Sequence, residues 1–116
     1  MTSSFKQIAH PKWPSGQNRP IAVLNLEPAE ISARYGIRFT VDRDDLDFAD
    51  VATVELGSGR HLIFVRYRNH PSPGTEVGAD LEDDWIEARQ ELLQALRLDR
   101  SAVTWMADES RGVQGS

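Results

Sequence analysis

The sequence predicts an α+β domain in which an antiparallel β-meander of four to five strands packs on one long C-terminal helix, preceded by a short N-terminal helix. Two observations carry this prediction. Residues 51–79 contain three strand-like segments, separated by a glycine-containing turn at 57–59 and a proline-rich turn at 70–74. Residues 81–98 then repeat apolar side chains at helical spacing, with Asp80 placed to cap them. A chain of 116 residues is expected to bury a single hydrophobic core of modest size.

The chain is expected to divide into an extended N-terminal arm at 1–20, a single domain at 21–106 and a disordered polar tail at 107–116. Three prolines punctuate the arm and favour extended or turn conformations. Trp13 lies between two of them. A large aromatic side chain there either pins the arm to its own domain or anchors a partner, a role in which tryptophan is enriched.

Proline, glycine and the alternation of apolar and polar residues predict the shorter helices and strands. Pro28 suits the first turn of a helix and Gly36 suits its end, so residues 28–35 are expected to form two helical turns. Residues 37–41 alternate apolar and polar side chains, as a half-buried strand does. The other two short strands are expected at 21–26 and around 103–105.

The register of the hairpin around residues 57–59 has two alternatives. A two-residue turn at 57–58 puts Glu55 opposite Arg60, whereas a three-residue loop puts Glu55 opposite His61. The two registers turn opposite faces of strand 60–68 toward the core. Both faces of that strand carry apolar residues, so something must cover the second face: either the Trp13 arm or another subunit.

The apolar arc of helix 81–98 spans about 180°, which is wider than one sheet contact needs. Arg89 lies within this arc, between Trp85 and Leu93. Its stem is expected to pack at the rim with its head in water, or else it pairs with a buried carboxylate or crosses an interface. Trp13, Trp85 and Arg89 are therefore candidate interface residues, and a homodimer built on this arc or on the exposed sheet face is one alternative for the protein's role.

Composition places the chain among ordinary globular proteins, with 40% hydrophobic and 27% charged residues. No apolar run approaches the roughly 20 residues of a membrane span, and the N-terminus lacks the apolar core of a secretory signal. Without cysteine there is no disulfide or thiol chemistry. We therefore expect a cytoplasmic protein. Arginine outnumbers lysine 11 to 2, which is typical of GC-rich bacterial coding.

The net charge of −5 is unevenly distributed: +3 through Arg38 and −8 in the remainder. An acidic body argues against nucleic-acid binding, which depends on neutralising phosphates. It fits either a basic protein partner or simple solubility. The candidate partner-binding acids are those of the loop within 42–50 and of the outer helix face: Asp44, Asp45, Asp47, Asp83, Asp84, Glu87 and Glu91.

Catalytic and metal-binding patterns are lacking in the sequence. A calcium loop of EF-hand type that began at Asp42 would need glycine at position 47 and glutamate at position 53. The sequence has Asp47 and Thr53 there, so the match fails. The histidines lack the spacing of a helical metal site. Ser72 follows His70 closely but has no nucleophile-elbow context. We therefore predict no catalytic residues, metal or cofactor, and the chain is more consistent with a non-enzyme.

The first hypothesis is a small acidic binding protein that works through protein–protein contact, as an accessory, regulatory, or inhibitor or immunity-type partner of a basic protein. The second is a small-molecule or anion binder, with an enzyme as one form of it, that uses the basic end of the sheet: Arg60, Arg66, Arg68 and His70. A pocket holding two of these arginines without carboxylate neighbours would favour the second. The third is the structural homodimer.

Overall fold

The computed structural model describes residues 5–43, 47–69 and 73–106. The elements in chain order are β1 (Phe5–Ile8), β2 (Asn18–Leu24), α1 (Pro28–Tyr35), β3 (Thr40–Arg43), β4 (Phe48–Leu56), β5 (His61–Tyr67), β6 (Thr75–Asp80), α2 (Trp85–Leu96), a short 3-10 helix (Arg100–Ala102) and β7 (Val103–Met106).

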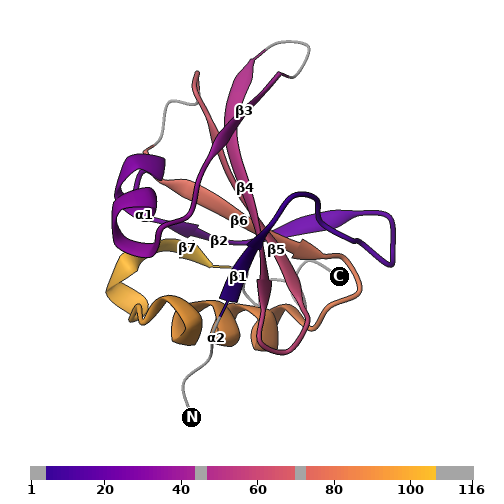
Figure 1. The fold of residues 1–116 in the computed structure, drawn as a ribbon. Coiled ribbons are helices and arrows are strands. Elements are labelled where there is room, and N and C mark those ends of the chain that lie inside the picture. Colours follow the sequence, from indigo (N-terminus) through magenta and orange to yellow (C-terminus); the bar gives the residue numbers. More distant parts are fainter. Residues whose placement is uncertain (1–4, 44–46, 70–72, 107–116) are drawn as a thin grey trace, which may run out of the picture.

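All strands belong to one antiparallel sheet with the order β1-β4-β5-β6-β2-β7, and β3 pairs with β4 on the same edge as β1 (Figure 1). The predicted meander is confirmed as β4-β5-β6. The predicted count of four to five strands was wrong, because the described sheet has seven. Strand β4 is nine residues long, and its outer edge accommodates β1 beside Thr53–Leu56 and β3 beside Phe48–Val51.

Strand β1 lies inside the segment predicted to be an arm. The extended connection that remains, residues 9–17, joins β1 to β2 and is called the arm below. Gln7 fastens β1 to the chain beyond α1: its Oε1 accepts from Arg38 N at 2.8 Å and its Nε2 donates to Arg38 O. This clasp covers part of the edge that β1 would otherwise present.

The C-terminal helix is shorter than predicted at both ends: α2 spans 12 residues rather than 81–98. Its N-cap is Asp84 instead of Asp80, and the Asp84 carboxylate accepts from Ile86 N at 2.9 Å and from Glu87 N at 3.2 Å. The helix ends at Arg97, which adopts a left-handed conformation with φ 54°. Asp80 and Asp84 are four residues apart and both have side chains that can cap a helix, so the sequence does not distinguish them. In the structure Asp80 is the last residue of β6.

The short N-terminal helix α1 matches its predicted bounds, and Gly36 closes it in the left-handed region with φ 70°. The predicted strand 37–41 is displaced to Thr40–Arg43, because Ile37 turns into the core instead of joining β4. In β2 a register shift between Pro20 and Ala22 lets both Ile21 and Ala22 bury their side chains.

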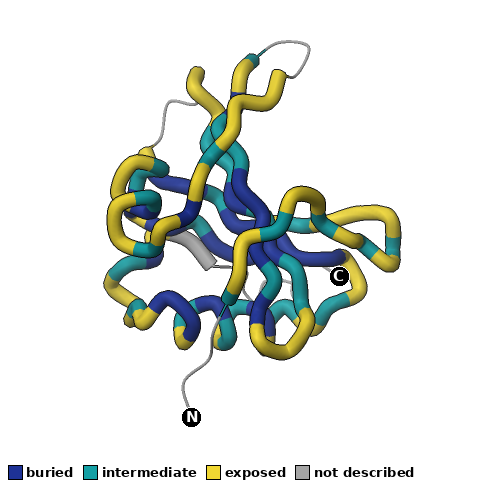
Figure 2. Tube along the Cα trace, viewed as in Figure 1, coloured by how far each residue is buried: buried dark blue, intermediate teal, exposed yellow. Residues whose placement is uncertain are grey.

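Both helices cover the same face of the sheet, and the core lies between them and the strands (Figure 2). The three-residue loop is the register observed, since Glu55 pairs with His61 and Gly59 adopts φ 92°. Leu62 and Phe64 therefore enter the core and are fully buried. The alternate residues of β5 face the opposite side, called the open face below, which neither α1 nor α2 covers.

The upper parts of β3, β4 and β5 project beyond both helices as a twisted three-stranded extension, called the projecting hairpin below (Figure 1). Its surface is mostly exposed, in contrast to the buried middle of the sheet (Figure 2). Within the described part of the chain, no helix is long and apolar enough to cross a membrane.

Candidate functional site

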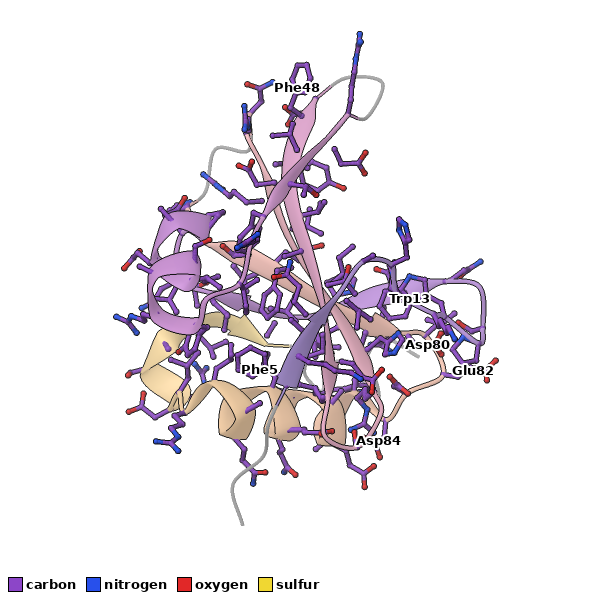
Figure 3. The ribbon with its side chains drawn as sticks, viewed as in Figure 1. Phe5, Trp13, Phe48, Asp80, Glu82 and Asp84 are labelled. Carbon is purple, nitrogen blue, oxygen red and sulfur yellow. The ribbon has the colours of Figure 1, made fainter. Side chains whose placement is uncertain are left out.

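The arm covers one end of the open face. It leaves β1 on the outer edge of β4 and reaches β2 beyond β6, so it crosses β4, β5 and β6 on this face. Lys12 N donates to His61 Nδ1 at 2.8 Å, and the Asp80 carboxylate accepts from Ser15 N at 3.2 Å and from Ser15 Oγ at 3.0 Å. Trp13 is half-buried on the arm (Figure 3). The arm therefore supplies part of the cover that the two-sided strand β5 requires.

Asp80 is the buried polar anchor of this crossing, with only 4% of its surface exposed. Burial alone would raise the pKa of its carboxyl, but hydrogen bonds from Glu82 N and from Ser15 N and Oγ more than offset this and lower the pKa below its ordinary value. The anchor thus stays charged, and stays an acceptor, well into the acidic range.

The other end of the open face holds a groove of about 260 Å³. Apolar side chains from β4 and β5 form one part of its lining, and polar groups contribute the larger share of its exposed surface. The lining residues are Asn18, Asp42, Arg43, Ala49, Val51, Ile63, Val65, Tyr67 and Glu76. The groove thus begins where the arm's cover ends, because Ile63 is the next residue after His61 on this face of β5.

Large apolar side chains are also exposed on the projecting hairpin. Val41, Phe48 and Tyr67 are 55%, 47% and 39% exposed. Phe48 lies near the outer end of the hairpin (Figure 3), where the Arg43 guanidinium stacks 5.9 Å from its ring centroid. Tyr67 lines the groove, whereas Val41 and Phe48 lie on the opposite face of the hairpin, because they alternate with the groove residues Asp42 and Ala49 along their strands. Tyr67 therefore extends the groove with an exposed apolar side chain, and the groove with Tyr67 is the candidate interaction surface.

The predicted acidic loop adjoins this surface in the chain. Residues 42–50 contain five aspartates and one arginine, a net charge of −4. Asp47 has a local role, because its carboxylate accepts from Phe48 N at 2.7 Å and from Asn69 N at 3.1 Å. The predicted partner-binding residues Asp44 and Asp45 lie outside the described residues.

The predicted acidic helix face turns partly inward, onto Arg60. The Arg60 guanidinium lies 3.5 Å from Asp83, 3.7 Å from Glu87 and 2.7 Å from Glu91, and only 17% of its side chain is exposed. Glu91 also accepts from Ser58 N at 3.1 Å and from Ser58 Oγ at 2.7 Å. This Arg60 cluster ties the β4–β5 loop to α2. Asp84, the remaining acid of the predicted face, caps the helix (Figure 3).

The predicted anion-binding arginines do not converge. Arg60 lies at the beginning of β5, whereas Arg66 and Arg68 lie at and beyond its other end, and His70 is outside the described residues. Arg66 Nε is 3.3 Å from Glu27 Oε1, and Arg68 donates to Asp50 at 2.9 Å.

Asp50 raises the pKa of Arg68, first through this hydrogen bond and then through its charge. Each described arginine of this set therefore has a carboxylate neighbour, which is the arrangement that weakens the anion hypothesis.

Trp85, at the start of α2, is flanked by two arginines: Arg19 of β2 lies 5.9 Å and Arg89 lies 5.5 Å from its ring. All three side chains are half-buried. Arg89 therefore packs on Trp85 of its own helix, and it stays a candidate interface residue. Among the described residues, no group of three or more His, Asp or Glu side chains is arranged to hold a metal ion.

Comparison of the chain with protein-family models, with curated proteins and with solved structures gave no match. The function proposed below therefore rests on the surface of the molecule alone.

Sequence reasoning did not single out the groove residues Val51, Ile63 and Val65 as a site. The signal that pointed to them was the apolar character of β5 on both faces, because the helices can cover only one of these faces.

Proposed function

We propose that this protein binds another protein, and that the partner seats an apolar side chain in the groove and basic side chains beside the acidic segment 42–50. The observation that carries the proposal is the groove on the open face, where a row of aliphatic side chains from β4 and β5 ends at exposed Tyr67 and is bordered by polar residues. Burying such a surface stabilises a complex by about 25 cal/mol per Å² of apolar area before the costs of association are subtracted.

A protein fits this surface better than a small molecule does. The groove floor is built of aliphatic side chains such as Val51 and Val65, and the charged groups Asp42, Arg43 and Glu76 lie among its lining. An apolar centre with a polar rim is the usual anatomy of a protein interface. Small-molecule sites instead enclose most of the ligand with convergent polar groups.

Charge complementarity favours a basic partner. The segment 42–50 carries a net charge of −4 and includes Asp42, which lines the groove. Opposite charge at the rim of an interface raises the rate of association more than it raises affinity. The partner is therefore expected to carry lysine or arginine next to the apolar side chain that enters the groove.

The test is selection from a random peptide library displayed on phage, with the protein immobilised. Enriched peptides should combine an aliphatic or aromatic residue with neighbouring lysine or arginine. Val65→Arg, which fills the groove with a charged chain, should reduce binding at least tenfold. Leu81→Arg is the matched control, because Leu81 is 44% exposed and lies outside the groove lining.

Asp42→Lys should slow association and flatten its dependence on salt. Enrichment of peptides without basic residues, or equal binding by Val65→Arg, would contradict the proposal. So would light scattering that shows a dimer dissociated by Val65→Arg but not by Leu81→Arg, because the groove would then belong to a second copy of this chain.

A further inference from the structure

We propose that the arm is an acid-sensitive latch: neutral His61 holds it over β5, and protonation of His61 releases it and lengthens the groove. The regulation of binding rests on the proposed function, whereas the latch itself does not. Its two anchor points are chemically different. Lys12 bonds a histidine, while Ser15 bonds the carboxylate of Asp80.

The hydrogen bond from the Lys12 amide determines which ring nitrogen of His61 carries the proton. A backbone N–H can only donate, so His61 Nδ1 must offer a lone pair at 2.8 Å. The ring proton is then on Nε2, which lies 3.3 Å from Glu55 Oε1 and donates to it. The latched arm therefore requires the neutral ring in one tautomer.

Protonation would direct an Nδ1–H at the Lys12 N–H, so the hydrogen bond becomes a repulsive contact. Histidine is the side chain whose ordinary titration lies within the physiological range. Loss of the neutral ring therefore removes the first anchor of the arm.

The charged groups around His61 determine which of its two hydrogen bonds is lost when the ring is protonated. On β4, Glu55 faces Nε2 and pairs with Lys6 of β1 across 3.9 Å. Asp80 of β6 and Asp83 before α2 line the same cavity of about 200 Å³ as His61, Lys12 and the adjacent Arg60.

Arg60 is balanced by its own three carboxylates. Glu55 thus remains to stabilise the imidazolium, and the contact that is lost is the one to Lys12.

The second anchor survives the same change in pH. Hydrogen bonds hold the pKa of Asp80 below its ordinary value, so its bonds to Ser15 persist at pH 5.5. Leu81 N also donates to Gln17 O at 3.0 Å. The arm should therefore lift around Lys12 and pivot at Ser15, without detaching from the sheet.

Lifting the arm would extend the groove. His61 and Ile63 are successive residues on the open face, and Ile63 already lines the groove. Removing the arm from His61 adds this end of β5 to the floor. A groove-binding peptide should consequently bind more tightly at pH 5.5 than at pH 7.5.

NMR of the labelled full chain tests the latch directly. At pH 7.5 the His61 ring nitrogens should report the Nε2–H tautomer, and the Lys12 amide should be protected from hydrogen exchange after correction for the intrinsic rate. As the pH is lowered until the His61 ring nitrogens report protonation, that protection should fall in parallel with the loss of the neutral ring, while the Leu81 amide stays protected.

His61→Asn is the matched variant, because the asparagine oxygen takes the position of Nδ1 but does not titrate. It should keep Lys12 protected at both pH values, whereas His61→Leu should lose that protection at both. Unchanged protection of Lys12 in the wild type, or equal loss at Leu81, would overturn the latch.

Binding of a library-selected peptide separates this proposal from the previous one. Tighter binding at pH 5.5 in the wild type, but not in His61→Asn, supports regulation by the latch. If the latch opens while peptide affinity does not change, the regulation is wrong. If no peptide is selected at either pH although the latch opens, the proposed function is wrong and the latch remains.

Discussion

Replacing Arg60 by methionine tests whether the Arg60 cluster holds the β4–β5 loop on α2. Methionine keeps much of the aliphatic stem and removes the charge that three carboxylates share. The substitution leaves Glu87 and Glu91 as unpaired like charges four residues apart on α2, which destabilises a helix, with Asp83 close to them just before the helix.

The size of the effect follows from burial. Breaking a fully buried ion pair costs about 3–5 kcal/mol, and an exposed pair contributes about 0–1 kcal/mol. The Arg60 side chain is 17% exposed, and its closest partner, Glu91, is 14% exposed. We expect a loss of about 2 kcal/mol in the free energy of unfolding, which lowers Tm by about 8 °C in a domain of this size. Lys6→Met, at a side chain that is 70% exposed, should cost under about 0.5 kcal/mol.

A double-mutant cycle measured by urea unfolding makes this reasoning refutable. Glu91→Gln should destabilise the wild type, because it weakens the bond to Arg60. In the Arg60→Met background the same change should be neutral or stabilising, because it relieves repulsion on α2. A coupling energy of about 1–2 kcal/mol is expected. If Glu91→Gln costs the same in both backgrounds, Arg60 is not the counter-ion of the cluster.

Two further predictions concern the backbone and the acid response. Gly74→Ala should cost more than about 2 kcal/mol in unfolding free energy by calorimetry, since its Cβ would lie 2.4 Å from Leu24 O and φ is 107°. Gly59→Ala, at φ 92° but in open space, should cost only about 1 kcal/mol. Because the pKa of Asp80 is lowered on folding, its ionised carboxylate stabilises the protein above the unfolded pKa, and this stability is lost as the pH falls through the folded value. Asp80→Asn should therefore flatten the decline in unfolding free energy between about pH 5 and pH 2, and an unchanged slope would contradict this assignment.

The features that were predictable from the sequence are those set by local chemistry. Pro28 and Gly36 bound α1 because each has a steric preference that acts within one turn. The β4-β5-β6 meander follows from alternation and short turns between neighbouring segments. In both cases the residues that decide the structure are close to each other in the chain.

The features that were not predictable depend on pairing across the chain. Strand β1 exists because β4 extends far enough to pair with it, about 50 residues away. Asp80 and Asp84 are equivalent as caps in the sequence, and only the crossing of the arm assigns Asp80 to Ser15. The groove follows from the same crossing, because the arm covers β5 at His61 and stops there.

The Arg60 cluster also changes how the acidic body of the protein should be interpreted. Three of the acids predicted to steer a partner from α2 already surround an internal guanidinium, so their field is partly cancelled at its source. On the projecting hairpin, Asp50 pairs with Arg68, yet the segment 42–50 still carries more negative charge than one arginine neutralises. In the sequence, the less compensated negative charge is therefore that of segment 42–50 and not that of the helix. Because electrostatic steering acts where charge is least compensated, we expect the acids of this segment, rather than those of α2, to orient a basic partner.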